Sequence, residues 1–132
     1  AFHTFIKKLC LHSAQGGVLF HCSAGKDRTG LGAIYLLNLL QVPADIIYQD
    51  YILTNKASTK MIKERLCYAV KNDLGDNYLH SIYDLSTANR CYYDQAISLI
   101  NNKYGGMTSY LKDVLQISNS MVEQLRYLYL TK

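Results

Sequence analysis

The chain has 132 residues, of which 49% are hydrophobic and 18% charged, so it is long enough to bury one core and is not intrinsically disordered. Its formal net charge, 14 − 10 = +4, suits an anionic ligand but is too small to indicate nucleic-acid binding. No secretory leader or run long enough to span a bilayer is visible.

The first predicted element is an amphipathic helix, because apolar side chains recur at helical spacing over residues 2–9. The apolar run at 17–20 predicts a short buried strand, and residues 22–28 form the loop that follows it. A helix over 29–41 comes next. Its nearly continuous apolar stretch, 31–40, indicates a central core helix.

Further along, Pro43 suits the first turn of a helix that runs to about Leu53, and a third helix presents one apolar stripe around 62–70. The segment 72–86 is predicted to be a loop because it holds Gly75 and several Asp and Asn residues. Three more helices are predicted, at 87–104, 108–115 and 119–130. The spacing of Ser120 and Glu123 is that of a capping box at the start of the last one, and Ser118 is a competing cap.

The third helix and the residues just before it are rich in basic side chains. They are Lys56, Lys60, Lys63, Arg65 and Lys71. Such a run is usually a solvated face, and the alternative is peripheral contact with an anionic membrane or a phosphoinositide headgroup.

The ten residues from His21 to Gly30, HCSAGKDRTG, carry the chemistry. A phosphate group needs several converging donors, and backbone N–H groups of a strand-to-helix loop, with the positive end of the helix dipole, supply them. Gly25 lets this loop turn, and Gly30 lets the helix pack closely on a neighbour. The planar guanidinium of Arg28 can hold two phosphate oxygens.

The same positive field favours the thiolate form of Cys22, which makes it a nucleophile. Thr29 is placed to donate its hydroxyl to the sulfur, and His21 to fix the loop through its ring N–H. The other cysteines, at 10, 67 and 91, lack C-x-x-C metal spacing and are expected to be reduced and in the core. A protective disulfide with Cys22 is the alternative.

Each of these residues alone has an ordinary structural explanation, since a strand-borne cysteine is usually a core residue and an arginine at a helix start is usually solvated. The combination is what favours a phosphate site. It is not the nucleotide-binding pattern G-x-x-x-x-G-K-[ST], because Asp27 stands at the Ser/Thr position.

His-Cys-x5-Arg-Thr resembles the signature of the cysteine-dependent protein tyrosine phosphatases, and the fuller string is similar to the atypical bacterial tyrosine and lipid phosphatases. The segments 50–55, DYILTN, and 104–107, YGGM, followed by Tyr110 and Leu111, resemble the C-terminal part of that family. The resemblance implies an α/β fold, a sheet flanked by helices. Because only one strand is predicted, we expect the chain to be a single domain that forms the C-terminal part of a larger catalytic domain, with other strands in an N-terminal half.

Two loop residues have competing interpretations. The resemblance implies that Asp27 is the acid that protonates the leaving group, whereas an Asp at this position often caps the helix. The segment Ala24-Gly25-Lys26 resembles that of phosphoinositide phosphatases, which implies that Lys26 contacts a second phosphate, and the alternative is a solvated side chain.

The sequence therefore predicts a phosphatase that acts on phosphotyrosine, with phosphoserine or phosphothreonine also possible substrates, through a cysteinyl-phosphate, without metal or cofactor. The catalytic residues would be Cys22, Asp27, Arg28 and Thr29; the phosphate-binding residues Ser23, Ala24, Gly25, Lys26, Asp27 and Arg28; the supporting residues His21 and Gly30. The alternatives are a phosphoinositide phosphatase, a catalytically silent phosphate-binding module, and a sulfur-transferring or arsenate-reducing loop. A cytoplasmic location is expected, with a secreted effector as the alternative.

Overall fold

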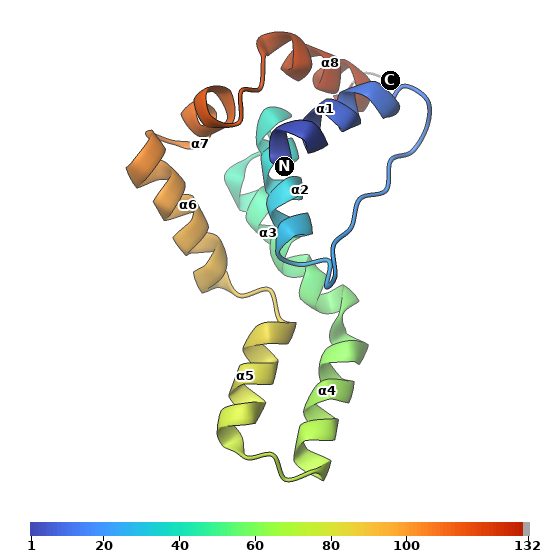
Figure 1. Ribbon diagram of the computed structural model, residues 1–132, viewed down its shortest axis with the longest axis vertical. Coiled ribbons are helices and arrows are strands. Elements are labelled where there is room, and N and C mark those ends of the chain that lie inside the picture. Colours follow the sequence, from blue (N-terminus) through green and yellow to red (C-terminus); the bar gives the residue numbers. More distant parts are fainter. Residues whose placement is uncertain (131–132) are drawn as a thin grey trace.

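The computed structural model describes residues 1–130, and every regular element in this range is a helix (Figure 1). In chain order they are α1 Phe2–His12, α2 Arg28–Leu39, α3 Ala44–Ala57, α4 Thr59–Lys71, α5 Asp76–Ser86, α6 Arg90–Tyr104, α7 Met107–Ser109, the π-helix η1 Tyr110–Val114, and α8 Asn119–Leu130. None of these helices is long and apolar enough to cross a membrane.

The core forms around α2, which contacts α1, α3 and α8. Its apolar side chains Ile34 and Leu39 are buried, as the nearly continuous hydrophobic run predicts. Ile6 of α1 and Leu125 of α8 are fully buried on the same core, so the first and last helices close over α2 (Figure 1). The predicted N-terminal amphipathic helix is confirmed.

The predicted α/β class is wrong for the described residues, because no strand occurs between residues 1 and 130. The segment 17–20 runs along the outside of the molecule between α1 and α2 (Figure 1). A strand needs a neighbour to pair its backbone groups, and no described segment pairs with this one. Leu19 is 89% exposed, while the ring of Phe20 packs on Phe5 with 4.8 Å between ring centroids.

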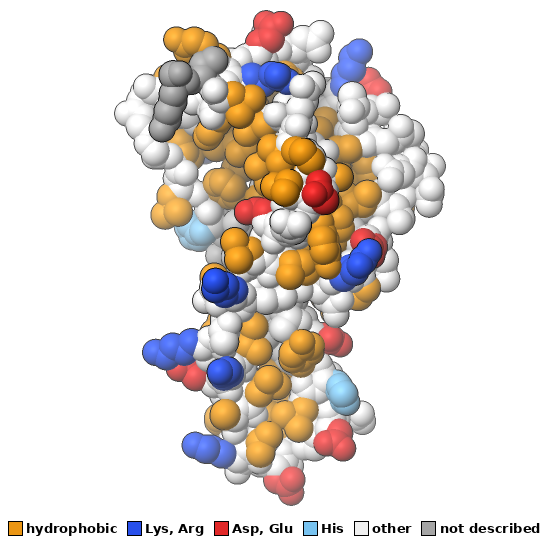
Figure 2. All heavy atoms as spheres, turned by 180° about the vertical axis from the view of Figure 1, so that it is seen from behind, with side chains coloured by type: hydrophobic (Ala, Val, Ile, Leu, Met, Phe, Trp, Pro, Cys, Tyr) orange, Lys and Arg blue, Asp and Glu red, His pale blue; other side chains and the backbone are white. Residues whose placement is uncertain are grey.

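The predicted loop at 72–86 is also wrong, because most of it is helix α5. Helices α4 and α5 contact each other and form a hairpin that projects from the rest of the molecule (Figure 1). Figure 2 shows hydrophobic side chains along the middle of this hairpin, with basic residues mostly on one edge. Leu79 and Ile82, three residues apart, supply the partly buried stripe of α5, which its polar neighbours mask in the sequence.

The other boundaries shift by a few residues for local reasons. Helix α6 begins at Arg90 rather than Thr87, because the Asn89 side chain accepts a hydrogen bond from the Cys91 N–H at 3.0 Å and caps the helix. Helix α8 has its predicted bounds. Its cap is Ser118, whose hydroxyl accepts from the Met121 N–H at 3.3 Å.

Candidate active site

Residues 22–27 form the turn that leads into α2, and Cys22 and Arg28 stand at its two ends. Gly25 has a φ of +72°, a backbone conformation that glycine adopts without strain. The backbone N–H groups of Thr29, Gly25 and Ala24 all favour the thiolate form of the Cys22 sulfur. The loop therefore converges its donors on the half-buried cysteine.

These donors lower the pKa of Cys22 to about 6. The largest cause is the Thr29 hydroxyl, followed by the Thr29 N–H, and the Gly25 and Ala24 amides add to it. Burial acts in the opposite direction but is the weaker influence. With this pKa, the thiolate is the main form of Cys22 at pH 7.

The Thr29 hydroxyl itself is buried and has no conventional hydrogen-bond partner among residues 1–130. A buried hydroxyl without a partner is costly, so its position calls for an explanation. The group that it acts on is the Cys22 sulfur, since this hydroxyl is the main cause of the lowered pKa of the thiol.

Arg28 is the first residue of α2 and its side chain is exposed. It forms no ion pair with any carboxylate in the described part of the chain, so its guanidinium is available to an external anion. It lines a cavity of about 260 Å³ together with Thr29, Phe20 and His21. His21 Nδ1 lies 3.3 Å from the Cys22 carbonyl oxygen, at the entrance to the loop.

Asp27 occupies the cap position of α2, yet its side chain does not cap the helix. Its Oδ1 atom instead accepts a hydrogen bond from Lys26 Nζ at 2.7 Å. The Lys26 side chain is only 8% exposed, whereas that of Asp27 is 59% exposed. The Lys26 ammonium is therefore not solvated. It lies 5.8 Å from the centre of the Tyr92 ring.

Two neighbouring helices support the loop. Tyr51 of α3 packs against Gly30, and Tyr92 at the start of α6 lies beside Lys26. Burial is the main reason that the pKa of Tyr51 is raised, and the charge of Asp27 adds to it. Asn55 joins the two helices, because its side chain donates to the Ala88 carbonyl at 2.8 Å and accepts from the Ala88 N–H at 2.7 Å.

Sequence reasoning named none of Tyr51, Asn55 and Tyr92 as site residues. Tyr51 and Asn55 belong to the DYILTN segment, so that resemblance contained a signal for both. Tyr92 is one of twelve tyrosines, and no motif in the sequence around it marks it as a site residue. Its contact with Lys26 joins residues far apart in the chain, so the local sequence could not predict it.

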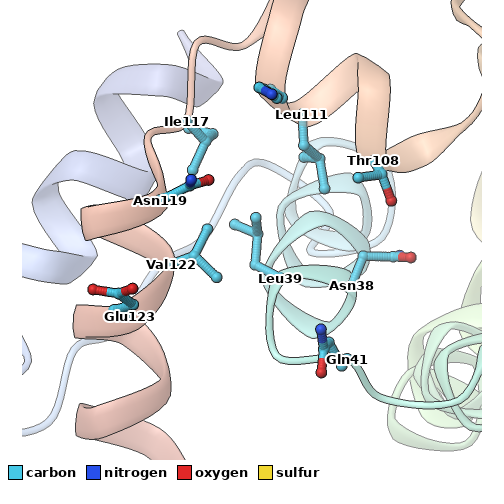
Figure 3. A pocket seen from close by; sticks show the side chains of 10 residues that line it. Asn38, Leu39, Gln41, Thr108, Leu111, Ile117, Asn119, Val122 and Glu123 are labelled. Atoms are coloured by element: carbon cyan, nitrogen blue, oxygen red, sulfur yellow. The ribbon is translucent and has the colours of Figure 1, made fainter.

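A further cavity, of about 390 Å³, lies at the other end of α2 and contains none of the loop residues. Figure 3 shows Asn38 and Leu39 of α2 on one side of it and Val122 of α8 on the other. It is separate from the convergent donors around Cys22, so we place the candidate active site at the loop.

The chain is also similar to known proteins along most of its length. Three relatives are a protein of Cupriavidus necator provisionally named a tyrosine-protein phosphatase, the tyrosine-protein phosphatase of Nostoc commune, and the triple specificity protein phosphatase PtpB of Mycobacterium tuberculosis. They are 32%, 32% and 27% identical to this chain over 91%, 85% and 88% of its length. The chain spans only 42%, 38% and 45% of theirs.

The sequence model of the tyrosine phosphatase family matches residues 1–131, which is nearly the entire chain and includes the whole loop. Together with the convergent donors on Cys22, this match settles the relationship: the chain belongs to the tyrosine phosphatase family.

Proposed function

We propose that the protein is a cysteine-dependent phosphatase that hydrolyses phosphotyrosine in proteins. The observation that carries this proposal is the pKa of Cys22, which the Thr29 hydroxyl and the backbone amides of Thr29, Gly25 and Ala24 lower to about 6. A thiolate at neutral pH on the same loop as an arginine without an ion-pair partner among the described residues is what nucleophilic attack on a phosphate ester requires. The names of the relatives support the same activity.

In the first step, the Cys22 thiolate attacks phosphorus in line, a sulfur–phosphorus bond forms, and the bond from phosphorus to the tyrosyl oxygen breaks. The Arg28 guanidinium and the loop amides hold the other three phosphate oxygens as charge shifts among them. Asp27 gives its proton to the departing phenolate oxygen, so that tyrosine leaves as the neutral phenol.

In the second step, water attacks the cysteinyl-phosphate and the sulfur departs as a thiolate. The Asp27 carboxylate takes the proton that the water loses, which restores the acid for the next cycle. The Thr29 hydroxyl, which is buried and is the largest cause of the lowered pKa of Cys22, stabilises the negative charge that returns to the sulfur. Inorganic phosphate then leaves the loop.

Phosphotyrosine is favoured over a phosphoinositide because of the position of Lys26. The interpretation of Lys26 as a contact for a second phosphate needs an ammonium group that reaches solvent, and this one is buried against Asp27 and Tyr92. Phosphoserine and phosphothreonine are further substrates to test, since the M. tuberculosis relative is named a triple specificity protein phosphatase. The activity proposed is that of the whole natural protein.

The test compares the natural full-length protein with its Cys22→Ser variant on a phosphotyrosine peptide, a phosphoserine peptide and a short-chain phosphoinositide. We expect turnover to be highest on phosphotyrosine and to vanish in the variant, while the variant still binds the peptide. Binding without turnover in the unchanged protein would indicate a silent phosphate-binding module. Vanadate, which resembles the transition state, should protect Cys22 from alkylation.

A further inference from the structure

The Lys26 ammonium is held between two groups, one on its own loop and one on a distant helix. Its Nζ atom lies 2.7 Å from Asp27 Oδ1 and 5.8 Å from the centre of the Tyr92 ring. A buried ammonium is stable only if other groups replace its hydration, and the carboxylate and the aromatic face both do so. Tyr92 is therefore part of what keeps Lys26 in place.

The backbone that carries Tyr92 is fixed by its neighbours, while Tyr92 itself is 40% exposed. It lies in the first turn of α6, which Asn89 caps, and the preceding residue, Ala88, exchanges two hydrogen bonds with Asn55 of α3. The next residue, Tyr93, contacts the rings of Tyr48 and Tyr51 on α3 at 5.2 and 5.6 Å between centroids. The start of α6 is thus fixed to α3.

The two members of the Lys26–Asp27 pair have opposite exposures. The Lys26 side chain is 8% exposed and that of Asp27 is 59% exposed. The ammonium therefore binds the carboxylate from the interior of the protein, and the carboxylate faces solvent. With Oδ1 engaged by Lys26, the Asp27 carboxyl loses much of its rotational freedom. A fixed carboxyl donates a proton more effectively than a mobile one, because proton transfer depends on position.

We propose that Tyr92 is a positioning residue of the phosphatase reaction, because its ring holds Lys26 behind Asp27 and so fixes the carboxyl that protonates the leaving group. This inference rests on the proposed function, in which Asp27 is the acid. The proposal adds to the site an aromatic residue that is 92 − 22 = 70 positions from Cys22 in the sequence. The contact requires the aromatic ring of Tyr92 and does not require its hydroxyl.

The experiment uses two substrates that differ in their need for an acid. Phenyl phosphate releases a basic phenolate, which must be protonated as it leaves, whereas para-nitrophenyl phosphate releases an anion that is stable without a proton. In the natural full-length protein, we expect Tyr92→Leu to lower kcat/KM, which reports the step in which the leaving group departs, by about tenfold on phenyl phosphate and by about twofold at most on para-nitrophenyl phosphate. Tyr92→Phe should restore both values.

The matched control is Tyr104→Leu. Tyr104 belongs to the same helix and lies under another lysine, Lys103, at 5.4 Å, but it is not part of the loop site. This variant should leave the ratio of the two kcat/KM values unchanged. If Tyr92→Leu does not fold, Lys26→Met, which removes the ammonium and keeps the length of the side chain, should give the same selective loss.

Equal losses on both substrates, or failure of Tyr92→Phe to restore activity, would overturn the positioning role. Failure of the proposed function looks different. In that case the unchanged protein hydrolyses neither substrate, or Cys22→Ser remains active.

Discussion

The ring of Tyr51 lies so close to Gly30 that a Cβ added to Gly30 would be 3.2 Å from two ring atoms, Cδ2 and Cε2. Tyr51 is only 7% exposed and cannot easily move aside. The start of α2, which carries Arg28 and Thr29, therefore packs directly on α3 through a glycine.

This contact predicts that Gly30→Ala is destabilising, although alanine is the better helix former. The gain in helix propensity is about 1 kcal/mol, and overpacking of a buried ring costs about 1–3 kcal/mol, so we expect a net loss of about 1 kcal/mol in the free energy of unfolding. Urea denaturation measures it. Gly17→Ala, where nothing lies within 4 Å of the added Cβ, is the control and should change stability by less than about 0.5 kcal/mol.

The effect of Gly30→Ala on the free energy of unfolding should change sign when the Tyr51 ring is removed. In a Tyr51→Leu background the clash disappears and only the helix propensity remains, so Gly30→Ala should then stabilise. If Gly30→Ala lowers the free energy of unfolding equally in both backgrounds, then the Tyr51 ring is not the cause of the destabilisation.

The loop chemistry was predictable because it is local. Cys22, Gly25 and Arg28 lie within one turn, and a loop before a helix has few ways to direct its amides, so residue spacing alone predicts convergent donors. The position of Lys26 was not predictable. Its ammonium lies near the ring of Tyr92, which is 92 − 26 = 66 positions later in the chain, and no local pattern encodes such a contact.

The same distinction explains the errors in the fold. Residues 17–20 have the composition of a buried strand, but a strand exists only where another strand pairs with it, and no described segment does. Helix α5 was missed for the opposite reason. Its stability comes from contact with α4, while its own sequence, with Gly75, Asp76 and Asn77 at the start, is typical of a loop.

The pKa of Cys22 predicts how its alkylation depends on pH. The rate should rise as the thiol loses its proton, with a midpoint near the pKa of about 6. Thr29→Val removes the hydroxyl that is the largest cause of the lowered pKa, so the midpoint should move upward by about one pH unit. Iodoacetamide labelling measures this in a background with Cys67 and Cys91 replaced by serine, because both are exposed and not in the core as predicted, whereas Cys10 is buried. An unchanged midpoint would show that the Thr29 hydroxyl does not act on the sulfur.

Asn55 is predicted to be the main link between α3 and the start of α6. Asn55→Ala removes both hydrogen bonds to Ala88, which is 3% exposed, and leaves a buried N–H and a buried carbonyl without partners. We expect a loss of about 3 kcal/mol in the free energy of unfolding. Asn72→Ala is the control, because its single bond to the Tyr68 carbonyl is exposed, and it should cost less than about 1 kcal/mol. Similar costs at the two positions would contradict this role.

Arg28 provides the sharpest test of how the loop holds phosphate. Arg28→Lys keeps the positive charge but replaces a planar fork, which can bind two oxygens, by a single ammonium. We expect the inhibition constant of vanadate to rise, and kcat/KM to fall, by about 100-fold. Stability should not change, because Arg28 is exposed and has no ion-pair partner among the described residues. Arg126→Lys on α8 is the control and should leave both constants as they are. If Arg28→Lys binds vanadate as tightly as the unchanged protein, then charge alone holds the anion, and the two-point grip assigned to the guanidinium is wrong.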